Sequence, residues 1–345
     1  MKDKDEKKYR FNEIRAYRVG ALLTVCDFLF SFPLLWSWAW KTTKGIKLDY
    51  LGDRKLIEKD IKNGAFFMTN HRDIILDASW LSLKLRCRYF IRPFMGIGNN
   101  LFAHKWIEWL VRFNRCFVVK RGAGAHAQLE NAKQLSAYIR HLRRNGKSIW
   151  LAQREGRAKD SNDLTQPSVL HMLTLLDEGD FFENVKTLNI CPVSITYEYD
   201  PCDYLKAREM QLKRDDPHWR KRAKDDVESM VTGIRGKKGR VVYRLTPSIN
   251  HEIDALLAEH PEVRELPNKE QLQLICDLID NHIHRGYEIF ERGTEFDEYI
   301  ESRLAKIDIP NKDEAFLREK LYEMYKFPEI NFQKSLKFNV ESLVK

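Results

Sequence analysis

A histidine and two aspartates lie close together in the segment Thr69–Asp77, which reads TNHRDIILD. An apolar run precedes this segment and a helical pattern follows it, so we predict a strand-to-helix turn, where α/β folds bind their ligands. A histidine in such a turn can remove a proton from an alcohol or an amine when a carboxylate orients its second ring nitrogen. We therefore predict that His71 is a general base paired with Asp77 in the first turn of the helix, and that Asp73 is the helix N-cap.

Basic residues follow two other apolar runs. Lys120 lies in the run Phe117–Gly122 (FVVKRG), and several charged residues lie in Gln153–Asp163 (QREGRAKDSND). Glu155 is a candidate for binding a substrate hydroxyl or for restraining an arginine. For each of these residues the alternative is an ordinary salt bridge in a loop. Three basic residues are candidates for binding a phosphate group, because their side chains pair well with phosphate oxygens: Arg121, Arg157 and Lys159.

Short apolar runs alternate with helical patterns from about residue 48 onward. This alternation predicts an α/β fold with a mostly parallel sheet flanked by helices, in which the candidate residues follow the carboxyl ends of strands. The predicted strands are rich in β-branched and aromatic residues: Ala65–Thr69, Arg115–Val119, Ser148–Ala152, Leu188–Tyr197 and Val241–Leu245. The predicted helices are Ile74–Arg86, Leu101–Phe113, an apolar stripe from Leu129 to Leu142 that ends before Gly146, and Ser168–Asp177.

A fourth segment, Cys191–Asp200 (CPVSITYEYD), carries Pro192 near the start of its strand. Proline lacks an amide hydrogen, so it predicts a sheet edge or a bend there. In this order the four segments resemble the blocks of the glycerophospholipid acyltransferase family, which includes the glycerol-3-phosphate and lysophosphatidic acid acyltransferases. The resemblance covers residues 45–250 and is carried by Asn70-His71-Arg72 with Asp77, Phe117–Arg121, Glu155-Gly156-Arg157, and Pro192-Val193.

The resemblance implies a direct acyl transfer. The histidine deprotonates a hydroxyl of a glycerophosphate or lysolipid acceptor. The hydroxyl then attacks the thioester of acyl-CoA or acyl carrier protein, with no metal, no other cofactor and no covalent enzyme intermediate. Substrate binding is assigned to the basic and motif residues near the dyad: Arg72, Lys120, Arg121, Glu155, Gly156, Arg157 and Lys159.

Two departures from the family pattern bear on this site. Five residues separate His71 from Asp77 instead of four, so Asp73 is the alternative partner of the histidine. Arg157 follows Glu155-Gly156 directly, without the threonine that is usual in the family. These departures concern the acceptor more than the reaction, and they leave glycerol phosphate, lysophosphatidate and an amino-acid lipid as alternatives.

The N-terminal part of the chain predicts contact with a membrane. Val19–Trp40 is apolar, but Asp27 and Pro33 argue against a simple transmembrane helix, and a group of tryptophans at its end is typical of a membrane interface. We predict a kinked or amphipathic insertion into one leaflet, with a buried core helix as the alternative. The expected parts are a charged and membrane-associating helical segment (1–47), an acyltransferase domain (48–250) and a helical C-terminal extension (251–345).

The chain has 59 Lys and Arg residues against 50 Asp and Glu residues, which favours an anionic partner. We expect this partner to be an anionic membrane surface on the cytoplasmic side rather than nucleic acid, for which no recognition motif is present. A membrane-attached binding protein without catalysis is the second hypothesis, but both members of the His/Asp pair are present. A serine or cysteine hydrolase is disfavoured, because the sequence has no G-x-S-x-G motif and no cysteine next to a histidine.

Overall fold

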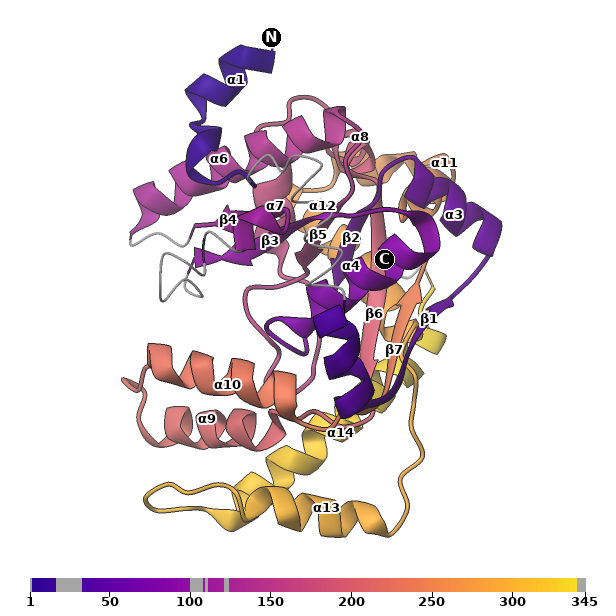
Figure 1. Ribbon diagram of the computed structural model, residues 1–345. Coiled ribbons are helices and arrows are strands. Elements are labelled where there is room, and N and C mark those ends of the chain that lie inside the picture. Colours follow the sequence, from indigo (N-terminus) through magenta and orange to yellow (C-terminus); the bar gives the residue numbers. More distant parts are fainter. Residues whose placement is uncertain (1, 17–32, 100–107, 109–110, 121–123, 340–345) are drawn as a thin grey trace.

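A mostly parallel sheet of seven strands, with helices on both faces, organises the computed structural model (Figure 1). The structure describes residues 2–16, 33–99, 108, 111–120 and 124–339. The strand order across the sheet is β1-β7-β6-β2-β5-β3-β4. The strands are β1 (Thr43–Tyr50), β2 (Phe66–Thr69), β3 (Phe94–Gly98), β4 (Cys116–Val119), β5 (Ile149–Ala152), β6 (Ile190–Tyr197) and β7 (Gly239–Leu245).

Strand direction brings the candidate residues to one edge of the sheet. Every pair of neighbouring strands described here is parallel except β6 and β7, which are antiparallel. The strands β2, β3, β4, β5 and β6 therefore share one direction, and their carboxyl ends meet at one edge. That edge receives the segments after β2, β4, β5 and β6, which are the four segments with candidate chemistry.

The five strands predicted from the sequence are confirmed as β2, β4, β5, β6 and β7. The sequence does not predict β1 or β3. β1 (TKGIKLDY) mixes lysines and a glycine with its apolar residues, and β3 (FMGIG) contains two glycines, which weaken the strand pattern. Both strands form because a neighbouring strand offers a parallel ladder, β7 for β1 and β4 for β3.

Pro192 is not at the sheet edge that its residue type suggests. β6 lies inside the sheet, between β7 and β2. The ladder with β7 begins at Val193, which pairs with Leu245, so Pro192 lies one residue outside it. Its carbonyl accepts the Thr246 amide at 3.2 Å, and the missing amide hydrogen leaves the β7 ladder intact.

Side chains alternate between two hydrophobic cores, one on each face of the sheet. In β2, for example, Phe66 and Met68 point into the first core and Phe67 into the second. Helices cover both cores, as expected for an α/β fold. The first core packs against α6 (Ala125–Arg144), α7 (Pro167–Thr174), α8 (Phe181–Leu188), α11 (Asn250–Glu259) and α12 (Asn268–Arg285), and the second against α3 (Arg54–Lys62) and α4 (Leu76–Tyr89).

Further helices form a layer next to the end of the sheet where β6 ends (Figure 1). They are α9 (Asp203–Asp215), α10 (Ala223–Arg235), α13 (Glu295–Leu304) and α14 (Glu314–Leu336). A third core joins Ala207 of α9 to apolar side chains of α13 and α14, including Ile300 and Leu321. The C-terminal helices therefore contact the segment that directly follows β6.

The described N-terminal residues form part of the fold. α1 (Lys2–Lys8) precedes the short helix η1 (Phe11–Glu13), and Phe11 and Ile14 are buried in the first core. The Val118 amide of β4 donates to the Ile14 carbonyl at 2.9 Å. This charged segment is thus fastened to the edge of the sheet.

A helix at residues 33–42 packs its Trp38 against the second core. Residues 17–32, which hold most of the apolar stretch Val19–Trp40, lie outside the described residues, as does most of the helix predicted at Leu101–Phe113. Within the described ranges, no helix is both long enough and apolar enough to cross a membrane.

Candidate active site

His71 and Asp77 form a hydrogen-bonded pair in the turn between β2 and α4. His71 Nδ1 lies 2.9 Å from Asp77 Oδ2, and the His71 side chain is 14% exposed whereas the Asp77 side chain is fully buried. The His71 ring also meets the Trp150 ring edge to face, with 6.3 Å between the ring centroids. The turn therefore holds a partly exposed imidazole against a carboxylate that the helix keeps buried.

Four donors converge on the carboxylate of Asp77. Besides His71, the amides of Arg72 and Asp73 donate to Oδ2 at 2.6 and 2.9 Å, and the Tyr197 hydroxyl donates to Oδ1 at 2.9 Å. Burial and the charge of Asp77 raise the pKa of Tyr197 well above its usual value, so this hydroxyl keeps its proton. A carboxylate can only accept, so Nδ1 of His71 carries the hydrogen and Nε2 keeps a lone pair that can take a proton.

Asp73, the alternative partner of His71, has a different position. Its Oδ1 accepts the amides of Ile75 and Leu76 at 2.9 and 2.7 Å and so holds the turn that leads into α4, but the helix begins at Leu76, with Ile75 rather than the predicted Asp73 at the N-cap position. Its Oδ2 faces Gly233 of α10 so closely that a Cβ atom at Gly233 would lie 2.0 Å away. Burial, above all, raises the pKa of the Asp73 carboxyl. The imidazole is therefore paired with the carboxylate in the first turn of α4, despite the extra residue between them.

Arg157 is buried in the segment that follows β5. Gly156 before it has a φ of +73°, a left-handed conformation that favours glycine. The Arg157 residue is 7% exposed. Burial disfavours its charged form, but the neighbouring Cys202 and Asp200 outweigh this effect and raise the pKa of Arg157. Its Nη1 atom has no hydrogen-bond partner in the part of the chain that the structure describes. A buried guanidinium nitrogen of this kind is a suitable donor for an anionic oxygen.

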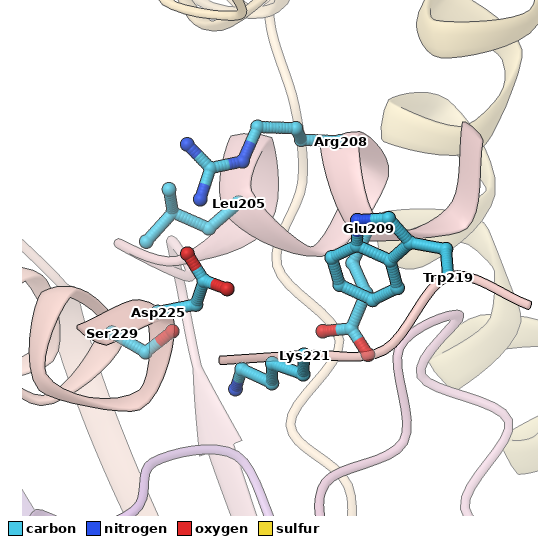
Figure 2. Close-up of a pocket in the computed structure, with 7 residues that line it drawn as sticks. All are labelled: Leu205, Arg208, Glu209, Trp219, Lys221, Asp225 and Ser229. Carbon is cyan, nitrogen blue, oxygen red and sulfur yellow. The ribbon is translucent and has the colours of Figure 1, made fainter. Parts of the chain in front are cut away.

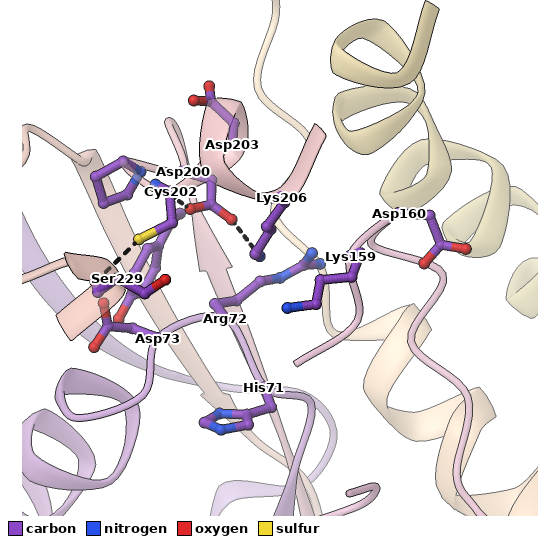
Figure 3. Close-up of polar contacts among 12 residues, drawn as sticks. His71, Arg72, Asp73, Lys159, Asp160, Asp200, Cys202, Asp203, Lys206 and Ser229 are labelled. Atoms are coloured by element: carbon purple, nitrogen blue, oxygen red, sulfur yellow. Dashed lines mark hydrogen bonds and ion pairs between the residues drawn. The ribbon is translucent and has the colours of Figure 1, made fainter. Parts of the chain in front are cut away.

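A charged cluster surrounds the start of α9 (Figure 3). Lys206 Nζ lies 2.5 Å from Asp200 Oδ2, and the Cys202 amide donates to Asp200 Oδ1 at 2.8 Å. The Cys202 thiol donates to the Ser229 carbonyl of α10 at 3.3 Å. Burial disfavours the charged form of Asp200, but Lys206 and Arg157 outweigh it and hold the pKa of Asp200 below its usual value. The cluster therefore joins α9 and α10 to the segment that carries Arg157.

Lys159 pairs with Glu209, one of the residues that line a small pocket within the α9–α10 layer. Its Nζ lies 2.6 Å from Glu209 Oε2 of α9. Burial and the nearby charge of Arg157 lower the pKa of Lys159 to about 8, although Glu209 opposes this shift. Figure 2 shows the side chains that line this pocket, which are Leu205, Arg208, Glu209, Trp219, Lys221, Asp225 and Ser229. Lys159 thus ties the Gln153–Asp163 segment to α9.

Arg72 is buried and paired inside the protein. Its Nη2 lies 2.7 Å from Asp163 Oδ2, and its side chain is 6% exposed. Breaking such a buried pair costs about 3–5 kcal/mol, so a substrate would gain little by drawing the guanidinium away. Its neighbour Asn70 exchanges two hydrogen bonds with the Ile195 backbone, at 2.8 and 2.9 Å. In this structure Arg72 holds the His71 turn through an internal ion pair with Asp163.

Lys120 and Glu155 lie at the periphery of the site. Lys120 forms an ion pair with Glu13 of the N-terminal segment and thereby lowers the pKa of Glu13. Two strands, β5 and β3, separate β4 from β2, so Lys120 does not adjoin the His71 turn. Arg121 lies outside the described residues. Glu155 is exposed, and its backbone amide donates to Gln166 Oε1 at 2.6 Å.

The sequence assigns no role to three residues that hold the His71 turn. Tyr197 lies in phase with Val193 and Ile195, which face the second core, and this alternation could have placed it on the α4 side of the sheet. Asp163 and Tyr287 are hydrogen-bonded across 124 positions of sequence. No local pattern joins residues so far apart.

Comparisons with known proteins address the family. A search of curated proteins gives no match. A family model described as acyltransferase matches residues 49–195, a range that begins in β1 and ends in β6. It includes the His71–Asp77 pair, the basic end of β4 and the Glu155–Arg157 motif. Residues 49–195 thus match the model of the acyltransferase family, the family of the glycerophospholipid acyltransferases.

Proposed function

We propose that this protein transfers an acyl group from acyl-CoA or acyl carrier protein to a hydroxyl of a glycerophosphate or lysolipid. The observation that carries this proposal is the contact of His71 Nδ1 with the buried Asp77 carboxylate, at 2.9 Å, which leaves Nε2 able to act as a base. The acyltransferase match over the same residues supports it.

The proposed reaction needs one base and an anchored acceptor. His71 Nε2 removes the proton from the acceptor hydroxyl while its oxygen attacks the carbonyl carbon of the thioester. The tetrahedral intermediate then collapses, the carbon–sulfur bond breaks, and the imidazolium gives its proton to the departing thiolate. The products are an ester and a free thiol. Asp77 stabilises the positive charge on the imidazolium during the step.

An anionic acceptor fits the buried basic groups of the neighbouring segment. Arg157 Nη1 has no partner among the described residues, and a phosphate oxygen is the group that a guanidinium binds best. Lys159, with its pKa at about 8, adds positive charge at neutral pH. These two residues favour glycerol phosphate or lysophosphatidate over an uncharged alcohol.

Residues 33–42 offer a surface for the membrane that holds lipid acceptors. Trp40 is 86% exposed and Leu34 50%, while Trp38 of the same helix packs on the core. Exposed tryptophan next to cationic side chains suits the interface of an anionic membrane. We therefore propose that this helix lies on the cytoplasmic leaflet, assisted by the exposed lysines at its end, Lys41 and Lys44.

The first prediction concerns the base. His71→Ala should lower kcat by about 10²–10⁴-fold or more, because general-base catalysis typically contributes that much. The melting temperature should change little, since His71 belongs to neither core. The assay is ester formation from labelled acyl-CoA with glycerol phosphate or lysophosphatidate as acceptor. A folded His71→Ala variant with near-normal turnover would contradict the mechanism.

Two aspartates provide a matched pair for the same assay. Asp77→Asn removes the charge that orients and stabilises the imidazole, so kcat should fall. Asp73→Asn keeps the Oδ1 acceptor of the Ile75 and Leu76 amides, so kcat and the melting temperature should stay near the wild-type values. The opposite result, an inactive Asp73→Asn beside an active Asp77→Asn, would show that the dyad is assigned to the wrong carboxylate.

The second prediction concerns the acceptor. Arg157→Ala should raise the acceptor KM roughly ten- to a hundred-fold, because a charge-assisted hydrogen bond contributes about 1.5–3 kcal/mol. Arg143→Ala is the control: this arginine is also largely withdrawn from solvent, but it donates to the Gly64 carbonyl before β2, at the opposite end of the sheet. An acceptor KM that is unchanged in folded Arg157→Ala would exclude Arg157 from the site.

The third prediction concerns the membrane. A Leu34→Ser, Trp40→Ser double variant should bind phosphatidylglycerol vesicles at least about ten-fold more weakly, because each buried apolar side chain contributes about 1.5–3 kcal/mol. Leu336→Ser is the control, since Leu336 is 52% exposed on α14. Co-sedimentation with vesicles measures the binding. Equal binding by the double variant and the wild type would mean that the helix at residues 33–42 is not the contact surface.

A further inference from the structure

Asp163, at the end of the segment after β5, is a fully buried carboxylate. Three donors share its Oδ2 atom: Arg72 Nη2 at 2.7 Å, the Tyr287 hydroxyl at 2.7 Å and Asn70 Nδ2 at 3.3 Å. The donors come from the catalytic turn and from the C-terminal part of the chain. Asp163 is therefore a junction between segments that are distant in sequence.

Two of these three donors flank His71. Asn70 is also hydrogen-bonded to the Ile195 backbone of β6, and the Arg72 amide donates to the Asp77 carboxylate. Asp163 thus holds the side chains on both sides of the histidine, while Asp77 holds the backbone and the imidazole. A base that is displaced by about 1 Å can lose on the order of a hundred-fold in rate, so the position of this turn matters for catalysis.

The third donor lies directly after α12, in the C-terminal extension. Tyr287 follows the end of α12, and His284 in the last turn of α12 lies with Nε2 2.6 Å from the Asp163 carbonyl. Burial lowers the pKa of His284, so its ring is neutral, and the carbonyl oxygen can only accept. His284 Nε2 therefore donates its hydrogen to Asp163. The C-terminal extension thus contacts the side chain of Asp163 through Tyr287 and its backbone carbonyl through His284.

We propose that Asp163 is a positioning residue for the His71 turn, and that Tyr287 and His284 make the C-terminal extension a working part of the active site. The proposal rests on the proposed role of His71 as the base. In this proposal the helices after residue 250 contribute to catalysis, because they hold the Asp163 carboxylate, which in turn holds the His71 turn in position.

Two tyrosines allow a matched test. Tyr287→Phe removes a hydroxyl that lies 2.7 Å from a buried carboxylate, Asp163, and Tyr325→Phe removes one that lies 2.7 Å from another, Asp203. Both tyrosines belong to the C-terminal extension, but Tyr287 is hydrogen-bonded to Asp163, whereas the Tyr325 hydroxyl contacts Asp203 and the Asp200 amide. Tyr287→Phe should lower kcat about ten-fold with the acceptor KM nearly unchanged, and Tyr325→Phe should change neither.

Hydrogen exchange measures the turn independently of activity. The amides of Arg72 and Asp73 are protected by the Asp77 carboxylate, so their exchange should become about ten-fold faster in Tyr287→Phe and stay unchanged in Tyr325→Phe. Equal protection of the turn in both variants, or a rise in KM without loss of kcat, would overturn the proposal. If the wild type transfers no acyl group, the proposed function fails, and the exchange comparison still decides the positioning role.

Asp163→Asn adds a test of coupling. If Tyr287 acts through Asp163, the double variant Asp163→Asn, Tyr287→Phe should have the same kcat as Asp163→Asn alone. Additive losses would show that Tyr287 acts by another route. Should Asp163→Asn fail to fold because Arg72 loses its counter-charge, the comparison of the two tyrosine variants remains decisive.

Discussion

The carboxylate of Asp77 is buried and accepts hydrogen bonds from four donors, and the geometry of the His71 turn follows from that requirement. A buried carboxylate is costly unless hydrogen bonds compensate it. The donors are the imidazole of His71, two backbone amides of the turn and the hydroxyl of Tyr197. Because β6 lies beside β2 in the sheet, Tyr197 reaches this carboxylate across a single strand spacing. Satisfying one charge therefore fixes the path of the turn, the tautomer of the histidine and the docking of α4 on the sheet.

The buried charged side chains of the described residues fall into two groups, those in ion pairs and those with incomplete hydrogen bonding. Most buried charges described here are paired, as in Arg72 with Asp163 and Lys206 with Asp200. Arg157 forms no ion pair with a carboxylate among the described residues, and its terminal Nη1 atom has no hydrogen-bond partner there. Buried pairs hold elements together, whereas an incompletely bonded cation can attract a ligand. The overall positive charge of the chain does not reveal this difference, which depends on which arginines the fold surrounds with carboxylates.

The sequence predicts the parts of the site that are local. The apolar runs of β2, β5 and β6 identify the strands, and the turn after β2 contains both the histidine and its partner. The sequence leaves Asp73 and Asp77 as alternatives, and the structure decides between them, because His71 Nδ1 contacts Asp77 whereas Asp73 accepts the amides of Ile75 and Leu76.

The long-range contacts could not be predicted in the same way. Asp163 meets Tyr287, and Lys120 meets Glu13, only because the order of strands and helices brings those segments together. The burial of Arg72 also depends on that packing, so a basic residue beside the histidine suggests a ligand contact where the structure has an internal ion pair. β1 and β3 have weak strand patterns and form because their neighbours offer ladders.

Product analysis of the wild-type protein tests most directly whether the acyl group passes from the thioester straight to the acceptor, as it must if His71 acts only as a base. The purified full-length chain is incubated with acyl-labelled acyl-CoA or acyl carrier protein, first alone and then with glycerol phosphate or lysophosphatidate, and the label is followed into lipid and protein fractions. A base that moves only a proton carries no acyl group, so we predict that the label appears as an ester of the acceptor and that none stays bound to denatured protein. Label held covalently by the protein before acceptor is added, or no ester with any of these donors and acceptors, would contradict this mechanism.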